Sequence, residues 1–299
     1  IQSFIDRFRS KASKAKQAQS RLKQLEKMQP IIGVTESSVS PFKFPSPKEI
    51  APPLIKIENG SVGYDENVVL DNLNISIDHE DRIALLGANG EGKSTFSKLL
   101  AGKINLIKGN ISKSRKLKVG FFAQHQLEEL EIGKSPFEHF LKEFPSESIS
   151  NIRSKLGAAG IGADISDNPV ENLSGGQKAR LMMALATIDA PHILILDEPT
   201  NHLDIESRES LVHAINDYTG SVIIVSHDVH LVKMVADRLW LVKDGRVSNY
   251  ESDIEDYRKK LLFSKSKKQN LKSENNLNGK LSNQETLTIP NSLIKICEN

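Results

Sequence analysis

The sequence has almost no cysteine and no long apolar run, and both absences narrow the class of protein. Cys297 is the only cysteine in 299 residues, so no internal disulfide framework can form, and a reducing cytosol is the expected environment. No stretch approaches the ~18 to 20 apolar residues that a membrane-spanning helix requires, and no signal-peptide pattern opens the chain. We therefore expect a soluble, cytoplasmic protein. Because the chain opens on Ile1 within a helical pattern, we also expect it to be the C-terminal part of a longer one.

Net charge is low, but positive charge is concentrated in one segment. The whole chain carries +2, whereas Ile1–Gln29 carries eight Lys and Arg against Asp6 and Glu26, a balance of 8 − 2 = +6. Apolar and small residues recur at helical spacing there, which predicts a basic amphipathic helix. Two interpretations stay open, a helix packed on a partner helix and a phosphate-binding arm. The arm is slightly favoured because the apolar stripe narrows to alanines where the charge is densest.

Length and composition predict one nucleotide-binding domain with long flanking segments. A chain of 299 residues that is 38% hydrophobic can bury one substantial core. Six prolines mark an extended linker, and a tail rich in Asn, Lys and Ser predicts disorder. The expected parts are a basic linker helix (1–29), the Pro-rich linker (30–53), the folded domain (54–263, with a helical subdomain at about 135–171) and the tail (264–299).

The clearest motif is a glycine-rich loop that fits the phosphate-binding pattern G-x-x-x-x-G-K-[ST]. It lies between an apolar run, Arg82–Leu86, and a helical pattern at 96–101, which is the strand, loop and helix context that this motif needs. Backbone N–H groups of such a loop and the helix N-terminus bind phosphate oxygens. The alternative is a glycine-rich turn with a chance Gly-Lys-Ser. The expected binding residues are Gly87, Ala88, Asn89, Gly90, Glu91, Gly92, Lys93, Ser94 and Thr95.

Other polar groups follow predicted strands or precede a predicted helix. Ser174, Gly175, Gly176 and Gln177 precede a helical run and predict a second anion-binding site. Asp197 and Glu198 end an apolar strand, where two adjacent carboxylates are costly without a cation or a function. The alternation of strands and helices predicts an α/β fold with a largely parallel central sheet.

Taken in order, these motifs resemble those of ATP-binding cassettes. The loop from Gly87 is similar to a Walker A motif, Leu173–Gln177 to the cassette signature, and Ile193–Glu198 to a Walker B strand. The Q-loop, D-loop and H-loop are matched by Gln124, Asp204 and His227. The resemblance implies a P-loop NTPase fold with a small antiparallel β subdomain and an inserted helical subdomain.

The resemblance also implies roles in Mg²⁺-dependent ATP hydrolysis. Phosphoryl transfer to water needs charge neutralisation and a positioned nucleophile. Asp197 and Ser94 would hold Mg²⁺, and Gln124 would contact both the metal and the water. Glu198 would activate or orient the attacking water, and His227 would contact the γ-phosphate. The alternatives for Asp197 and Glu198 are a salt bridge and a helix cap.

Two further implications concern adenine and a second cassette. Tyr64 lies 23 residues ahead of Gly87, where the family has an aromatic residue that stacks on adenine; its other interpretation is a packed surface aromatic. In the family the signature closes over the nucleotide of another cassette. Only one cassette is present in this chain, so we expect an upstream cassette, or less readily self-pairing.

Several stretches resemble the ABC-F branch of the family. Phe4–Met28 is similar to the end of the linker between the two cassettes of ABC-F proteins. Lys178–Arg180 and Asn201–Asp204 also fit that branch, and Phe121–Leu127 and Asp253–Tyr257 are most similar to its bacterial YheS subgroup. This resemblance implies a soluble ATPase that acts on the ribosome in translation and contacts rRNA and tRNA through its basic linker.

Three other functions stay open at this point. One is the ATPase subunit of a membrane transporter, against which the basic linker and the lack of a membrane segment argue. Another is ribosome protection against antibiotics, which depends on a linker tip upstream of Ile1. The third is a nucleic-acid binder that has lost ATPase activity, against which the intact Lys93, Asp197, Glu198 and His227 argue.

Overall fold

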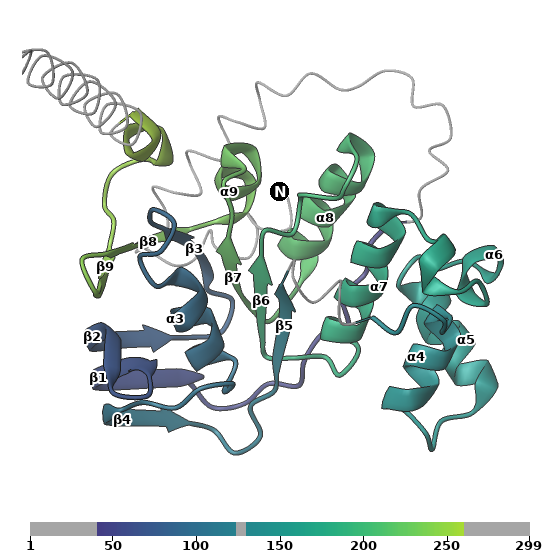
Figure 1. Ribbon diagram of the computed structural model, residues 1–299, viewed down its shortest axis with the longest axis horizontal. Coiled ribbons are helices and arrows are strands. Elements are labelled where there is room, and N and C mark those ends of the chain that lie inside the picture. The colour runs from purple at the N-terminus through teal and green to yellow at the C-terminus, as the bar shows by residue number, and fades with distance from the viewer. Residues whose placement is uncertain (1–40, 124–129, 260–299) are drawn as a thin grey trace, which may run out of the picture. The chain divides into compact units, whose positions relative to one another are not determined.

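The computed structural model describes residues 41–123 and 130–259 (Figure 1). Residues 41–123 and 130–251 belong to one unit, and residues 252–259 belong to a second, in which 254–259 are helical. Three predicted features lie outside the described residues: the linker helix at 1–29, the Q-loop residue Gln124, and the tail at 264–299.

The first unit is built on a six-stranded sheet with the strand order β5-β6-β7-β3-β8-β9. Neighbouring strands pair in parallel, except that β8 and β9 form an antiparallel hairpin. This arrangement confirms the α/β fold and the largely parallel sheet. The strands are β3 (Arg82–Leu86), β5 (Val119–Ala123), β6 (Ile193–Asp197), β7 (Ser221–Val225), β8 (Arg238–Lys243) and β9 (Arg246–Asn249).

Both faces of this sheet are buried, because successive side chains of its strands point to opposite sides. In β6, Leu194 and Leu196 join a core that includes residues of α7 (Gly175–Thr187) and α8 (Ile205–Asp217). Ile193 and Ile195 join a second core with α3 (Lys93–Leu100) and the small sheet. Figure 1 shows α3 on one side of the central strands and α7 and α8 on the other.

A second, antiparallel sheet has the order β2-β1-β4 and confirms the small β subdomain. Its strands are β1 (Ile55–Tyr64), β2 (Asn67–Ile77) and β4 (Lys108–Lys113). Strand β2 is continuous, although the turn-forming residues Asp71 and Asn72 separate two apolar runs in its sequence. The apparent turn at Asp71-Asn72 is a bulge, where the register shifts against β1 and Asn72 takes a φ of 51°.

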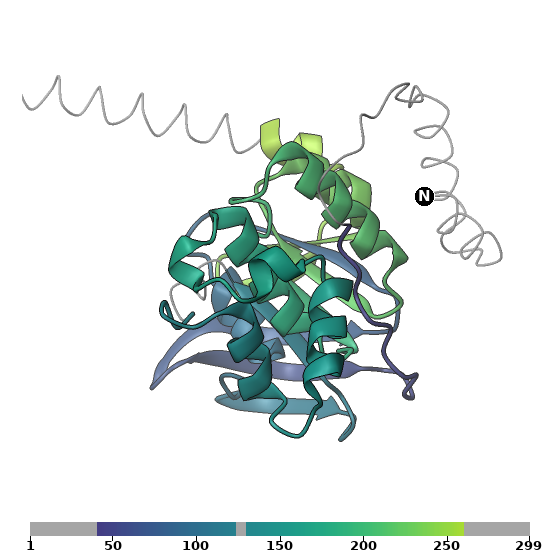
Figure 2. The ribbon, with the colours of Figure 1, turned by 90° about the vertical axis from the view of Figure 1, so that its right-hand side faces the viewer.

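The inserted helical segment consists of α4 (Pro136–Glu143), α5 (Ile149–Ala158), α6 (Ala163–Ser166) and the 3₁₀ helix η3 (Val170–Asn172). Helix α4 starts at a capping box in which Ser135 and Glu138 satisfy each other's backbone N–H groups. Its Phe140 is buried with Ile152 and Leu156 of α5. Figure 2 views this helical subdomain from its own side.

The residues just before the small sheet are packed onto the cassette, although they form no helix or strand. Phe42 is only 5% exposed, its N–H donates to Ser210 Oγ at 2.9 Å, and its ring lies 4.0 Å from the Arg180 guanidinium. The described end of the Pro-rich segment is therefore part of the core.

We expect Phe42→Ala to lower the free energy of unfolding by about 3 to 4 kcal/mol, because it removes a buried ring and leaves a cavity. Urea unfolding of the chain measures this, and Lys43→Ala, at an exposed neighbouring position, is the control. Equal stability of the two variants would show that the Phe42 contacts are weak.

Candidate functional site

The phosphate loop runs from the end of β3 to the start of α3 and depends on its glycines. Gly87, Gly90 and Gly92 have φ angles of 154°, 87° and 101°, in the region that side chains rarely adopt. A Cβ on Gly87 would lie 2.5 Å from the Val242 carbonyl oxygen. The loop can therefore pass close to β8 only without a side chain at this position.

Gly92 offers a test of this loop with an internal control at Gly90. An added Cβ at Gly92 would lie 2.9 Å from Leu70 Cδ2 and 3.0 Å from Val69 Cγ1, whereas at Gly90 it would meet nothing within 4 Å. We expect Gly90→Ala to cost about 1 kcal/mol of unfolding free energy through backbone strain alone, and Gly92→Ala about 1 to 3 kcal/mol more. Denaturant unfolding of both variants measures the difference, and equal costs would contradict this packing.

Lys93 follows the last loop glycine, and its ammonium group turns back into the loop. Its Nζ donates to the carbonyl oxygens of Gly87 at 2.8 Å and Ala88 at 2.9 Å. Burial lowers the Lys93 pKa, and the nearby carboxylates of Asp197, Glu198 and Glu91 oppose that shift. A buried cation surrounded by loop carbonyls and carboxylates is placed to exchange these partners for an anion.

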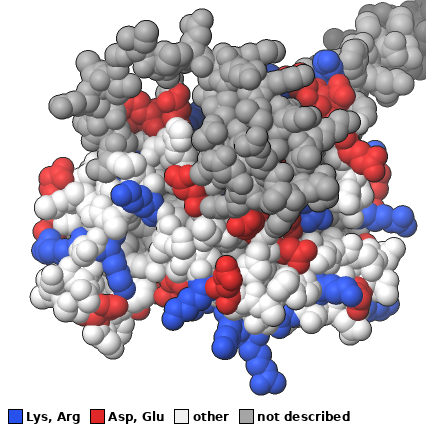
Figure 3. All heavy atoms as spheres, turned by 180° about the vertical axis from the view of Figure 1, so that it is seen from behind, with Lys and Arg blue, Asp and Glu red and all other residues white. Residues whose placement is uncertain are grey.

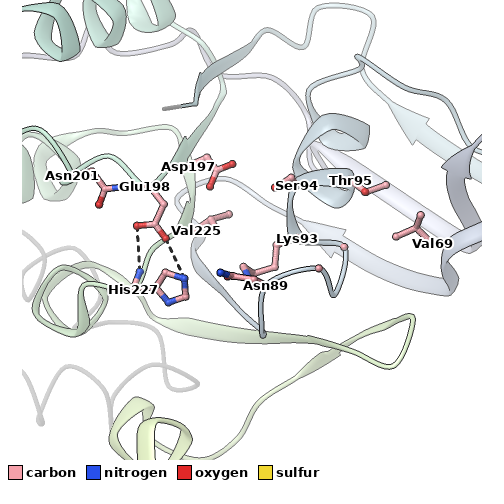
Figure 4. Close-up of a pocket in the computed structure, with 12 residues that line it drawn as sticks. Val69, Asn89, Lys93, Ser94, Thr95, Asp197, Glu198, Asn201, Val225 and His227 are labelled. Carbon is pink, nitrogen blue, oxygen red and sulfur yellow. Dashed lines mark hydrogen bonds and ion pairs between the residues drawn. The ribbon is translucent and has the colours of Figure 1, made fainter. Parts of the chain in front are cut away.

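A cavity of about 600 Å³ opens beside this loop, and Figure 4 shows the side chains around it. Residues of the phosphate loop line one side, and residues that follow β6 and β7 line the other. The full lining is Val69, Asn89, Gly90, Gly92, Lys93, Ser94, Thr95, Asp197, Glu198, Asn201, Val225 and His227. Four of the predicted groups, Lys93, Asp197, Glu198 and His227, thus come together because strands β3, β6 and β7 are neighbours in one sheet.

Glu198 is held in a strained conformation at the end of β6. Its φ is 51°, and its N–H donates to the Val225 carbonyl oxygen at 2.8 Å. Its carboxylate faces His227, whose Nε2 lies 3.6 Å away and whose backbone N–H lies 3.5 Å away (Figure 4). Burial raises the Glu198 pKa, and the His227 charge opposes the shift. A carboxylate of raised basicity that lines this cavity is suited to accept a proton.

Ser94 and Asp197 fit a magnesium site. Both line the cavity, Ser94 at the start of α3 and Asp197 at the end of β6. Within the described ranges, no group of three or more His, Cys, Asp or Glu could hold a metal by itself. One carboxylate and one hydroxyl are the donors typical of Mg²⁺ that also binds phosphates and water.

The signature residues are not among those that line the cavity. Ser174 caps α7 through a capping box in which Ser174 Oγ accepts from the Gln177 N–H and the Gln177 side chain accepts from the Ser174 N–H. A Cβ on Gly175 would lie 3.6 Å from the His202 Cβ. The signature is therefore next to the segment between Glu198 and α8, and away from the phosphate loop's own cavity.

The structure places the remaining predicted residues as follows. Tyr64 ends β1, is 43% exposed, does not line the cavity, and lies with its ring 5.7 Å from Lys98 Nζ. Asp204 caps α8, and the hydrogen bond from Ser207 lowers its pKa.

Gln124 directly follows Ala123, which pairs with Asp197, but lies outside the described residues. Asn201 was not predicted to line the cavity, although it is the amide nearest in sequence to Glu198.

Comparison with known proteins identifies relatives of this chain. Two family descriptions match it, both named ABC transporter, over residues 70–201 and 1–44. A probable ATP-binding protein YheS of Escherichia coli (strain K12) is 44% identical over 86% of this chain and 40% of its own length. YheS of Haemophilus influenzae is 40% identical over 95% of the chain and 44% of its own length, and Protein GCN20 of Saccharomyces cerevisiae is 37% identical over 88% and 35%. The chain thus spans about two fifths of the length of these relatives.

Solved structures support the fold. The cassette MJ0796, in a dimeric post-hydrolysis state bound to ADP and Pi, superposes with a TM-score of 0.57 over 66% of this chain and 97% of its own, at 22% identity. Among residues 41–123 and 130–259, no helix has the length and apolar character that crossing a membrane requires.

Proposed function

Because this chain belongs to the ABC-F family of ATP-binding cassette proteins, we propose that it binds Mg-ATP in the cavity beside Gly87–Thr95 and hydrolyses it there. The observation that carries the proposal is the convergence of Lys93, Asp197, Glu198 and His227 on one cavity from three neighbouring strands. A cation, a metal ligand and a base in one cavity are the kinds of group that phosphoryl transfer to water uses, and the imidazole of His227 lies beside the base.

Each of these side chains has a role that follows from its position. Lys93 exchanges its two loop carbonyls for the outer phosphate oxygens, assisted by loop N–H groups and the N-terminus of α3. Ser94 and Asp197 would hold Mg²⁺, which supplies charge neutralisation when bound. Glu198 accepts a proton from the attacking water, and His227, at the same edge of the cavity, orients Glu198 and faces the γ-phosphate. Gln124, which follows β5, would contact metal and water.

We further propose that catalysis requires a second cassette. Ser174, Gly175, Gly176 and Gln177 present a capped helix N-terminus that does not line the cavity of their own chain. Such a helix end suits the phosphates of a nucleotide bound elsewhere. Tyr64, exposed at the end of β1, is available to stack on adenine.

The proposed setting is the ribosome in the cytoplasm. The similarity to YheS and GCN20 and the +6 balance of Ile1–Gln29 favour an ABC-F protein in which ATP-driven closure of two cassettes positions a basic linker against rRNA or tRNA. A Lys- and Arg-rich linker that binds phosphates would lose affinity steeply with salt.

Fractionation of cells that express the full-length protein tests this setting against its alternatives. We expect the protein in the ribosomal pellet at low salt and its release at high salt. Recovery with a detergent-extracted permease would instead favour a transporter ATPase. Sensitivity of a deletion strain to a ribosome-targeting antibiotic, reversed by the gene, would favour ribosome protection as the role.

A further inference from the structure

A second strongly basic stretch lies within the cassette, from the last turn of α3 through β4 to the residue before β5. Residues 98–118 contain seven Lys and Arg and no Asp or Glu. The seven are Lys98, Lys103, Lys108, Lys113, Arg115, Lys116 and Lys118. None of the seven has a role in the proposed ATP hydrolysis. They are also separate from the predicted basic linker helix at 1–29, which has the net charge of +6.

Four of these cations form an exposed set, which we call the basic corner: Lys103, Lys113, Arg115 and Lys116. The position of a Cβ on Gly102 would be 3.8 Å from Lys113 Nζ, which places the end of β4 beside Gly102 and Lys103. Arg115 and Lys116 follow at once in a turn closed by the Leu117 N–H donating to the Ser114 carbonyl oxygen at 3.1 Å. Figure 3 shows Lys and Arg side chains projecting from the lower edge, where Figure 1 places the chain between β4 and β5.

These four charges are not neutralised within the part of the chain that the structure describes. None of the four makes an ion pair with a described carboxylate, whereas Lys118 Nζ lies 3.7 Å from an Asp189 carboxylate oxygen, and the Ser61 hydrogen bond and the Lys108 charge both lower the pKa of Asp71. Lys103 lies over the Phe121 ring at 4.6 Å, a contact that leaves its charge available. Like charges gathered without counter-charges repel one another, and a polyanion would relieve that repulsion.

A simpler explanation is protection of an edge strand. β4 is the outer strand of the small sheet, all six of its residues are exposed, and lysines on such a strand prevent pairing with other chains. That explanation covers Lys108 and Lys113, which lie on β4. It does not cover Lys103, Arg115 and Lys116, which lie outside the strand and present no unpaired strand edge.

We propose that the basic corner binds the phosphate backbone of RNA and is a contact separate from the linker. An RNA duplex offers a dense row of phosphates to which several Lys and Arg can bind at once. A membrane surface is disfavoured, because the corner is a strand end and a turn and lacks the amphipathic helix that buries an apolar face at a bilayer interface. The identification of this RNA as ribosomal rests on the proposed function.

The test uses the 299-residue chain without nucleotide and a fluorescently labelled RNA duplex. The variant combines Lys103→Gln, Lys113→Gln, Arg115→Gln and Lys116→Gln. The control combines Lys43→Gln, Lys48→Gln, Lys142→Gln and Lys243→Gln, which removes the same charge from other exposed positions. We expect the variant to bind at least about tenfold more weakly, and the slope of log K against log salt to be less negative by about 3 to 4, with little change in the control. Thermal unfolding midpoints close to that of the unaltered chain establish that both proteins are folded.

Equal losses in variant and control, or no RNA binding by the unaltered chain, would overturn the proposal. Binding of phosphatidylserine vesicles that is lost in the variant while RNA binding persists would overturn it in favour of a membrane surface. Because the RNA measurement needs neither ATP nor a second cassette, its result is independent of nucleotide-gated ribosome binding. If only the variant loses RNA binding, and the full-length protein shows no ATP-dependent retention on ribosomes, the basic corner is supported as an RNA-binding surface and the proposed function is refuted.

Discussion

Replacing Glu198 by Gln should lower ATP turnover by about 10²-fold or more while ATP binding is retained. The change keeps the shape of a side chain that is held at a φ of 51° and faces His227, but removes its ability to accept a proton. Loss of a general base typically costs 10²- to 10⁴-fold in rate. Phosphate release by the full-length protein, whose other cassette still binds ATP but carries the matching Glu-to-Gln change, measures turnover, and calorimetry measures binding.

Glu209→Gln, at an exposed position on α8, is the matched control for the loss of one carboxylate. It should hydrolyse ATP at the unaltered rate. Turnover by Glu198→Gln equal to that of this control would show that another group activates the water.

The raised pKa of Glu198 adds a second expectation, since its deprotonated form is lost at a higher pH than for an ordinary glutamate. The acid limb of kcat should therefore lie above the usual glutamate range.

Lys93→Ala should weaken ATP binding itself, by about 10- to 100-fold. A hydrogen bond to a charged group contributes about 1.5 to 3 kcal/mol, which corresponds to that range of affinity. In the free site Lys93 also bridges the carbonyls of Gly87 and Ala88, so its loss removes two contacts that hold the loop. The effect should appear in the Kd, in contrast to that of Glu198→Gln.

Titration calorimetry of the chain with ATP and Mg²⁺ measures the Kd of the Lys93 variant. The control is Lys142→Ala, whose ammonium group pairs with Glu131 in the helical subdomain. Both variants remove one lysine, but only Lys93 lies in the cavity. A Kd for Lys93→Ala equal to that of the control would contradict the assignment of the phosphate loop.

The parts of the fold that could be predicted are those where local pattern and chemistry agree. The apolar run Arg82–Leu86 predicted β3 with its observed bounds, because this strand is buried on both faces. The two carboxylates at the end of β6 and the histidine after β7 were predicted as site residues on chemical grounds and family resemblance. Their meeting follows from the pairing of neighbouring parallel strands, whose carboxyl ends share one edge.

The parts that were missed depend on contacts distant in sequence. Strand β4 has no apolar alternation, since all of its residues are exposed and only pairing with β1 holds it. Helix α9 (Val229–Val235) is rich in β-branched residues that favour strands, and it begins at Asp228, whose side chain accepts from two N–H groups. The burial of Phe42 depends on Arg180 and Ser210, far along the chain.

The most direct test of the account is nucleotide-dependent binding of ribosomes. The full-length protein carrying Glu198→Gln, with the matching change in its other cassette, would be sedimented with ribosomes at moderate salt, in ATP and in ADP. Retention with ATP and loss with ADP is the predicted result, because a closed ATP-bound pair of cassettes holds the linker against RNA. Absence from the ribosomal pellet with both nucleotides, while ATP binding is intact, would contradict the proposed function.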